Sequence, residues 1–264
     1  MQLAGPGAFG PPRNAEEALA VLRRAGELGV DHIDTAQYYG PDVVNNLIRQ
    51  ALYPYPENLV LVSKVGAKRD PEGRWLPALK PDELRSGVLD NLRSLGVDRL
   101  DAVNLRLMDG GLAFDEQLDA MVAIRDEGLI AGIGLSNITR AQLLHAVQRT
   151  EIVCVQNPFN LVERTSLPIL RECEELGIAF VPFFPLGSAF GGVNPLLTHP
   201  GVVEVAARLA VTASQVALAW LLDQGDNVLL IPGTSSSVHL LENLTAGQVQ
   251  LDDDARKALD AVTL

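Results

Sequence analysis

Residues 30–40 have the sequence VDHIDTAQYYG, in which an apolar run leads into a polar segment that ends in glycine. Residues 59–66, with the sequence LVLVSKVG, repeat this arrangement. Apolar runs without clean alternation are typical of parallel strands covered on both faces. The two runs are therefore predicted to be neighbouring strands that deliver Asp34 and Lys64 to their carboxyl ends.

The alternation of strand-like and helical patterns continues to the end of the chain. No linker, charge run or low-complexity segment divides it, so we predict a single domain, residues 1–264. Asn14 with Glu17, Thr139 with Gln142, and Thr212 with Gln215 match the capping box that begins many helices. The predicted strands are 30–35, 59–64, 100–106, 130–136, 152–157, 178–184 and 227–232. The predicted helices are 15–28, 42–51, 81–95, 115–127, 139–149, 165–176, 202–224, 237–246 and 252–262.

Parallel strands joined by helices form either an open doubly wound sheet or a closed barrel. Polar residues at the carboxyl ends of many strands favour the barrel, because in a barrel those ends meet at one mouth. No G-x-G-x-x-G follows the first strand, and no G-x-x-x-x-G-K-[ST] occurs. We therefore predict an α/β fold, a (β/α)8 TIM barrel. The polar strand-end residues are Asp34, Lys64, Arg106, Ser136, Asn137, Gln156, Asn157 and Thr234.

The strand count leaves one position of the barrel open. Only seven strands are predicted, and the segment 1–12 is too rich in glycine and proline for a full strand. We expect Met1–Ala4 to be the tail of a first strand that is missing or incomplete. The seam beside strand 30–35 would then expose unpaired backbone groups unless another segment covers it.

Composition excludes several classes of partner. The net charge of −12 disfavours nucleic acid and anionic membranes, which bind basic surfaces. The longest stretch without Asp, Glu, Lys or Arg, residues 176–203, is interrupted by glycine and proline, so no membrane helix is predicted. Cys154 and Cys173 lack a metal-ligand pattern and are interpreted as buried thiols of a cytoplasmic protein, and no metal site is predicted.

A carboxylate, a phenol and an amine lie at the ends of the first two strands, as Asp34, Tyr39 and Lys64. These groups are suited to donating a proton to a carbonyl oxygen. Tyr39 could alternatively be a tyrosine that packs at a strand end, and Asp34 a turn or helix-capping residue.

Five motifs, in order along the chain, resemble those of the aldo-keto reductases. They are DTAQYYG (34–40), SK (63–64), GLSN (134–137), VQNPFN (155–160) and IPGT (231–234), the last followed by Glu242 and Asn243. The resemblance covers essentially the whole chain. It implies a (β/α)8 barrel that reduces small aldehydes or ketones with NADPH. It also implies a truncated start, because relatives carry a short hairpin and a first strand before the point where this chain begins.

The resemblance assigns catalytic roles to four positions. Tyr39 would be the general acid, Lys64 would stabilise its phenolate, and Asp34 would hold Lys64. The family's fourth residue is a histidine, which Arg106 replaces here. An arginine cannot act as a neutral imidazole. It could anchor the carbonyl oxygen and lower the pKa of Tyr39, or form a salt bridge to Asp109 or another nearby acid, and both readings stay open.

The resemblance also implies a cofactor site. Ser136, Asn137 and Gln156 would bind the nicotinamide carboxamide, Asn137 also being a candidate turn residue, and Phe183 would stack on the nicotinamide ring. A glycine-rich loop, residues 187–192, would approach the pyrophosphate, and a helix N-terminus would attract phosphate. Family members place cations at the positions of Gly233 and His239, so a preference for NADPH is expected but weakened, with NADH as the alternative. The remaining expected cofactor residues are Leu186, Gly187, Ser188, Thr234, Ser235, Ser236, Glu242 and Asn243.

The substrate is expected to be a small carbonyl compound in an open pocket. The segment 68–81, with Trp75, either overhangs that pocket or packs against the barrel rim. Two other functions remain open: an NADP(H)-binding module with little or no catalysis, and a lyase that uses Lys64 as a Schiff base. The oligomeric state cannot be read from the sequence, although a monomer is favoured.

Overall fold

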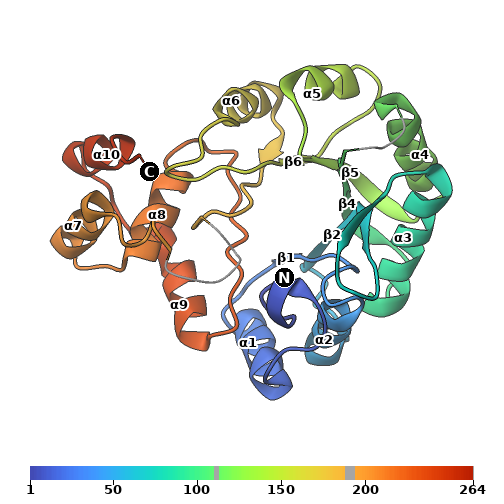
Figure 1. The fold of residues 1–264 in the computed structure, drawn as a ribbon, viewed down its shortest axis with the longest axis horizontal. Helices are drawn as coiled ribbons and strands as arrows, with labels where there is room; N and C mark the ends of the chain where they lie inside the picture. Colours follow the sequence, from blue (N-terminus) through green and yellow to red (C-terminus); the bar gives the residue numbers. More distant parts are fainter. Residues whose placement is uncertain (110–112, 188–193, 264) are drawn as a thin grey trace. The chain divides into compact units, whose positions relative to one another are not determined.

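The structure, a computed structural model, describes residues 1–109, 113–187 and 194–263. The chain divides into two compact units, Met1–Val155 (unit 1) and Gln156–Leu264 (unit 2). Figure 1 shows the helices and strands of both units.

Unit 1 is built on parallel strands. Strands β1, β2, β4 and β5 pair in that order, with β6 next to β5 in the strand order. The register places Asp34 beside Val62, and Arg106 beside Ser136, so the polar residues of neighbouring strands emerge at the same end. The strands are β1 (His32–Asp34), β2 (Val60–Arg69), β4 (Leu100–Arg106), β5 (Ile130–Ser136) and β6 (Cys154–Gln156).

Five α-helices of unit 1 cover one face of these strands (Figure 1). In α3, Leu84, Val88, Leu92 and Leu95 are buried, three or four residues apart, so one apolar side of the helix faces the sheet. Helix α5 begins with the predicted capping box of Thr139 and Gln142. The helices are α1 (Ala15–Glu27), α2 (Val43–Leu52), α3 (Pro81–Leu95), α4 (Phe114–Asp126) and α5 (Arg140–Val147).

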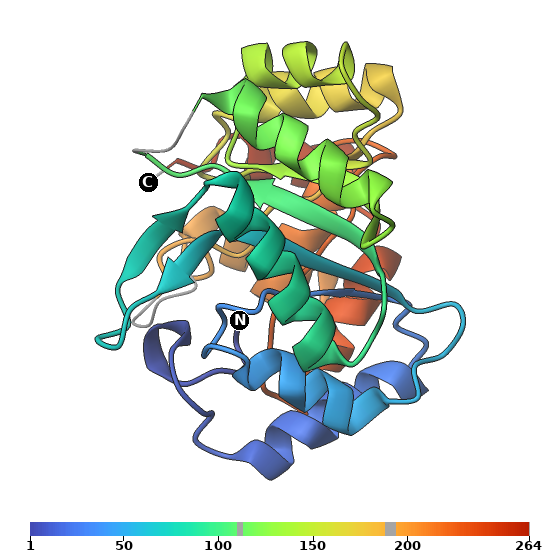
Figure 2. The ribbon, with the colours of Figure 1, turned by 90° about the vertical axis from the view of Figure 1, so that its right-hand side faces the viewer.

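An antiparallel hairpin extends the second strand and was not predicted. Strand β3 (Trp75–Ala78) pairs with the end of β2, and Figure 2 shows the two strands projecting beyond the parallel sheet. The turn between them is held by Asp70, whose carboxylate accepts hydrogen bonds from the backbone N–H groups of Glu72 (3.1 Å) and Arg74 (2.7 Å). The hairpin accounts for most of the segment 68–81.

The start of the chain differs from the expectation of a strand tail. Ala4 N–H donates to the Met1 carbonyl (3.1 Å), which closes a turn, and a short 3-10 helix, η1 (Pro6–Ala8), follows. Arg69 of β2 holds this segment by donating to the carbonyls of Gly7 and Ala8, each at 3.0 Å. The N-terminal segment thus packs against the hairpin.

Unit 2 consists mainly of helices. The single helix predicted over 202–224 is wrong: α7 and α8 are separate, because Ala210 adopts the left-handed conformation (φ 55°) and Thr212 then caps a new helix with Gln215. Among the described residues no single helix is long and apolar enough to cross a membrane, and α7 with α8 passes that test only as a pair bent by 93°. The elements are α6 (Leu167–Leu176), β7 (Ala179–Phe180), α7 (Pro200–Leu209), α8 (Ala213–Leu222), α9 (Ser237–Thr245), η2 (Ala246–Gln248) and α10 (Asp253–Asp260).

Two predicted strands of unit 2 are much shorter than expected. Only Ala179 and Phe180 form a strand in 178–184, and in 227–232 only Val228 forms a bridge, to Phe180. Hydrogen bonds from Phe180 N–H to the Asn227 carbonyl (2.8 Å) and from Leu229 N–H to the Phe180 carbonyl (2.9 Å) complete this contact. The apolar sequences were identified correctly, but the pairing between them covers only residues near the start of each.

Both cysteines are buried thiols, as predicted. Cys154 in β6 donates to the Asn104 side-chain oxygen at 3.3 Å, and burial raises the pKa of the Cys154 thiol to about 12. Cys173 lies on the buried side of α6.

Candidate active site

The centre of the candidate site is a buried ion pair between Lys64 and Asp34. Asp34 pairs with Val62 in the sheet, so Lys64, two residues further along β2, emerges on the same face. The two side chains are only 5% and 6% exposed. Lys64 Nζ also donates to the Thr35 carbonyl at 3.1 Å. A charge this deeply buried needs such partners, because the loss of hydration would otherwise exclude it.

Tyr39 lies against this pair. The chain turns directly after β1, with Tyr39 N–H donating to the Ala36 carbonyl (3.0 Å). The turn brings the ring over Lys64, whose Nζ lies 5.4 Å from the ring centroid, within the range of a cation–π contact. The carboxylate, the amine and the phenol that the sequence predicts to act together therefore do lie together in unit 1.

The pKa of Tyr39 is raised above its ordinary value. Burial is the main cause because it disfavours the phenolate, the charge of Asp34 acts in the same direction, and Arg106 acts in the opposite one. The phenol therefore remains protonated at neutral pH. This is the form that an acid needs before it donates a proton.

Arg106 ends β4 and lies near both tyrosines, since its charge lowers the pKa of Tyr38 as well as that of Tyr39. Strand β2 approaches β4 closely at this point. A Cβ on Gly66 would lie 2.3 Å from the Arg106 carbonyl oxygen, and Gly66 has φ +104°, so only glycine fits. Gly66, two residues after Lys64, thus allows β2 to pass close to the backbone of Arg106.

An aromatic cluster borders the tyrosine. The ring of Tyr38 is buried and makes edge contacts with Tyr39 and Trp75, both with centroids 5.4 Å apart. Arg69 covers the Trp75 ring at 4.1 Å, and Met108 packs on the same cluster. Sequence reasoning missed Tyr38 and the hairpin that carries Trp75. The turn signal Asp-Pro-Glu-Gly at 70–73, between two extended runs, would have indicated that hairpin.

Ser136 is the last residue of β5, and Asn137 follows it, as predicted. Ser136 is fully buried, and its Oγ has no hydrogen-bond partner among the residues that the structure describes. Asn137 adopts a left-handed turn (φ 61°) just before α5 and donates to the Leu107 carbonyl at 3.2 Å. Asn137 therefore has the turn role, and the hydroxyl of Ser136 fits a ligand that brings a hydrogen-bonding group, such as a carboxamide.

In unit 2, Gln156 is buried at the end of β6. Phe183 is fixed through its backbone: it forms a bridge with Pro158, and its N–H donates to the Asn157 carbonyl at 3.1 Å. The carbonyl of Leu186 accepts from the Asn194 side chain (2.5 Å), and Gly187 has φ +88°, which favours glycine. Ser188 and residues 189–192 of the predicted loop lie outside the described residues.

The N-terminus of α9 is capped by the hydroxyls of two predicted residues. Ser236 Oγ accepts from His239 N–H at 3.4 Å, and Thr234 Oγ1 accepts from Ser236 N–H at 3.0 Å. Gly233, Ser235 and His239 are exposed, whereas Glu242 and Asn243 are half-buried on the helix. No lysine or arginine occurs in 233–243, so hydroxyl and amide groups would provide most of a phosphate site here.

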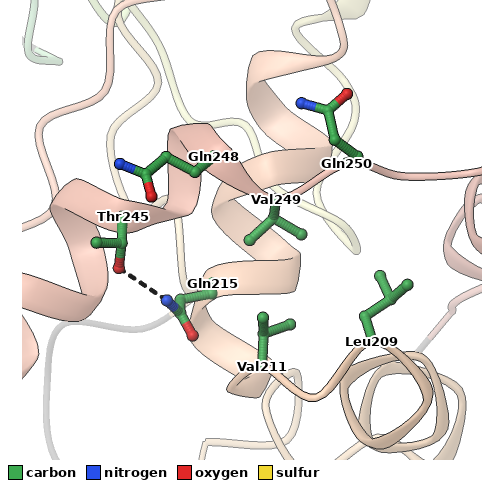
Figure 3. Close-up of a pocket in the computed structure, with 7 residues that line it drawn as sticks. All are labelled: Leu209, Val211, Gln215, Thr245, Gln248, Val249 and Gln250. Carbon is green, nitrogen blue, oxygen red and sulfur yellow. Dashed lines mark hydrogen bonds between the residues drawn. The ribbon is translucent and has the colours of Figure 1, made fainter.

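A separate pocket of about 400 Å³ lies in unit 2, beside the connection of α7 and α8 (Figure 3). Its Gln215 side chain donates to Thr245 Oγ1 at 2.9 Å, so these polar groups satisfy one another. None of the predicted site residues lines this pocket. Its lining residues are Leu209, Val211, Gln215, Thr245, Gln248, Val249 and Gln250.

Comparisons with known proteins identify the relatives of the chain. The model of the family described as "Aldo/keto reductase family" matches residues 3–263. Pyridoxine 4-dehydrogenase of Escherichia coli is 48% identical over 269 aligned positions, which cover 100% of this chain and 92% of that protein.

Solved structures of aldo-keto reductases have the same fold. A thermostable enzyme, Tm1743, bound to the inhibitor epalrestat, has a TM-score of 0.83 and 32% identity, covering 98% of this chain and 92% of that one. An enzyme from Klebsiella pneumoniae, bound to NADP and acetate, has a TM-score of 0.80 and 26% identity, covering 93% and 84%. The curled parallel sheet with its helices is thus that of the (β/α)8 barrel of this family.

Proposed function

Because the chain belongs to the aldo/keto reductase family, we propose that it reduces small aldehydes or ketones to alcohols with NADPH, and that Tyr39 is the general acid. The observation that carries this proposal is the position of the half-buried Tyr39 ring over the buried ion pair of Lys64 and Asp34.

A nicotinamide cofactor, when bound, would supply the hydride, and the residues of the chain would supply the proton. As negative charge develops on the carbonyl oxygen, Tyr39 donates its phenolic proton to it. The high pKa of Tyr39 does not prevent this transfer, because an alkoxide is more basic than a phenolate. The Lys64 ammonium beside the ring then offsets the new phenolate charge, and Asp34 holds the ammonium in place.

Arg106 is proposed to act on the substrate side of this acid. Its charge is close enough to lower the pKa of Tyr39, and we take this as support for the anchoring role over the alternative of a salt bridge to Asp109 or another nearby acid. A fixed cation would also stabilise the developing oxyanion, but it cannot switch its protonation state as histidine does.

The cofactor assignment follows the chemistry of the available groups. The buried hydroxyl of Ser136, the amide of Asn137 at the turn before α5 and the buried amide of Gln156 suit the nicotinamide carboxamide, and the ring of Phe183 suits stacking. We assign the cofactor phosphates to residues 186–188 and to Gly233, Thr234, Ser235, Ser236 and His239. Glu242 and Asn243 are assigned to the adenine. The absence of Lys and Arg in 233–243 predicts a small preference for NADPH over NADH.

The substrate that we propose is a small aromatic aldehyde, with pyridoxal as the first candidate. The relative that is 48% identical is named for the oxidation of pyridoxine at position 4, and the reverse reaction reduces an aldehyde on a pyridine ring. The neighbouring rings of Tyr38 and Trp75 provide an aromatic surface that suits such a substrate.

One alternative has an observation in its favour. Replacement of the family histidine by Arg106 suits a protein that binds NADP(H) and has little catalysis. Quenching of NADPH fluorescence without NADPH oxidation by any of a panel of aldehydes would select this alternative.

The deciding experiment compares Tyr39→Phe with Tyr38→Phe, which removes the hydroxyl of the adjacent buried tyrosine. With pyridoxal and NADPH, Tyr39→Phe is expected to lower kcat at least about 100-fold, because general acid catalysis contributes this much. NADPH affinity and the activity of Tyr38→Phe should stay within about threefold of wild type. Turnover of Tyr39→Phe at the wild-type rate would overturn the assignment.

A further inference from the structure

Two fully buried polar residues are direct sequence neighbours of the ion pair of Asp34 and Lys64. Thr35 follows Asp34, and Ser63 precedes Lys64. Side chains alternate along a strand, so Thr35 and Ser63 point away from the side of the sheet that carries the ion pair. Their hydrogen bonds go to α2 and α3 instead.

The side chains of these two residues belong to one buried hydrogen-bonded cluster, which consists of Thr35, Ser63, Asn45, Asn91 and Ser94. Thr35 Oγ1 donates to Asn45 Oδ1 at 2.8 Å, and Ser63 Oγ donates to Asn91 Oδ1 at 2.5 Å. Asn45 Nδ2 joins the two arms by donating to Asn91 Oδ1 (2.9 Å) and to Ser94 Oγ (3.0 Å). All five side chains are buried.

The cluster fixes the group that binds the Lys64 ammonium. The carbonyl of Thr35 accepts from Lys64 Nζ at 3.1 Å, its N–H donates to the Val62 carbonyl at 2.9 Å, and its hydroxyl is tied to Asn45. The residue therefore has one orientation. Apolar side chains would pack the helices on the strands equally well, but only directed hydrogen bonds determine how the two strand ends are oriented.

We infer that Asn45 and Asn91 are positioning residues for the proposed reductase reaction: through Thr35 and Ser63 they align the ends of β1 and β2 so that Lys64 faces Tyr39. This inference rests on the proposed function, since it concerns the residues assigned to proton transfer. The two asparagines do not touch the reacting atoms and act through the strand ends.

The test removes one hydrogen bond at a time. Thr35→Val keeps the shape and the β-branch but loses the bond to Asn45, and Ser63→Ala loses the bond to Asn91. The matched control is Ser94→Ala, because Ser94 belongs to the same cluster and bonds Asn45 but lies on α3, away from both strand ends. Thr35→Ser restores the hydroxyl and serves as the rescue variant.

Kinetics provide the first measurement. Thr35→Val and Ser63→Ala are each expected to lower kcat for pyridoxal about 10-fold with little change in KM, because small misplacements of catalytic groups act on the chemical step. Thr35→Ser and Ser94→Ala should stay within about twofold of wild type. If Ser94→Ala loses as much kcat as Thr35→Val, the cluster only stabilises the fold and the inference is wrong.

The second measurement needs no turnover. The NMR signal of the Lys64 ammonium, assigned by its loss in Lys64→Met, should shift and exchange with solvent faster in Thr35→Val and Ser63→Ala but not in Ser94→Ala. An unchanged signal in both strand-end variants would refute the inference. If wild type shows no carbonyl reduction, the proposed function fails, and this measurement still decides whether the cluster orients Lys64.

Discussion

Replacement of Lys64 by methionine should destabilise the protein strongly, and far more than replacement of both members of the ion pair. Methionine has nearly the volume of lysine, so little cavity forms, and the main loss is electrostatic. Asp34 is 6% exposed and would remain as a buried carboxylate without its cation. Removing one partner of a buried ion pair in this way costs about 3–5 kcal/mol.

This free energy translates into a measurable melting shift. For cooperative unfolding of all 264 residues, the entropy of unfolding is about 0.55 kcal/mol/K, so Lys64→Met should lower Tm by about 5–9 °C. The double variant Lys64→Met with Asp34→Asn leaves no buried charge. Its free energy of unfolding should lie within about 2 kcal/mol of wild type, since neutral replacement of a buried pair is often tolerated.

The measurement is urea titration and differential scanning calorimetry of four proteins: wild type, the two single variants Lys64→Met and Asp34→Asn, and the double variant. If Lys64→Met loses less than about 1 kcal/mol, the value typical of an exposed pair, the ion pair is open to water. Equal losses in the single and double variants would also refute the reasoning, because the unpaired carboxylate would then cost nothing.

Three further outcomes follow from the same region. Above about pH 10 the unfolded chain releases the phenolic protons of Tyr38 and Tyr39, while the folded chain keeps them because both pKa values are raised. The free energy of unfolding should therefore fall by about 1.4 kcal/mol per pH unit for each tyrosine. Urea titrations of Tyr38→Phe at several pH values should show the contribution of one tyrosine less. Gly66→Ala should destabilise by at least about 2 kcal/mol in thermal unfolding, because its Cβ would meet the Arg106 carbonyl; a variant as stable as wild type would refute the close approach. Thr139→Ala should cost about 1 kcal/mol through loss of the α5 cap, with kcat unchanged, and a large loss of kcat would contradict a purely structural role.

Elements with long periodic patterns could be predicted from the sequence. Strands β4 and β5 and helix α3 have the predicted bounds, because each is a long apolar or amphipathic run between clear turn signals. The break between α7 and α8 could not be seen, since Ala210 has high helix propensity and adopts its left-handed conformation only in the folded chain. The prediction of one domain stays a prediction.

For the candidate site, sequence identified the groups but not their environment. The neighbouring positions of Asp34 and Lys64 followed from adjacent parallel strands, and the turn after β1 brings Tyr39 to them. The rise in the pKa of Tyr39 could not be predicted, because its burial depends on packing in a cluster with Trp75 and Met108, which are distant in sequence, and the hairpin that carries Trp75 was not recognised. The role of Asn45 and Asn91 was invisible for the same reason.

The two buried thiols make the protein a convenient host for site-specific labels. A thiol reagent reacts with the thiolate, and Cys154 combines burial with a pKa of about 12, while Cys173 is completely enclosed in its helix packing. A cysteine introduced at the exposed Glu72, in the turn of the β2–β3 hairpin, would therefore be alkylated selectively without removal of either native residue. A fluorophore attached there would report on ligands that reach the aromatic cluster, in a protein whose interior remains unmodified.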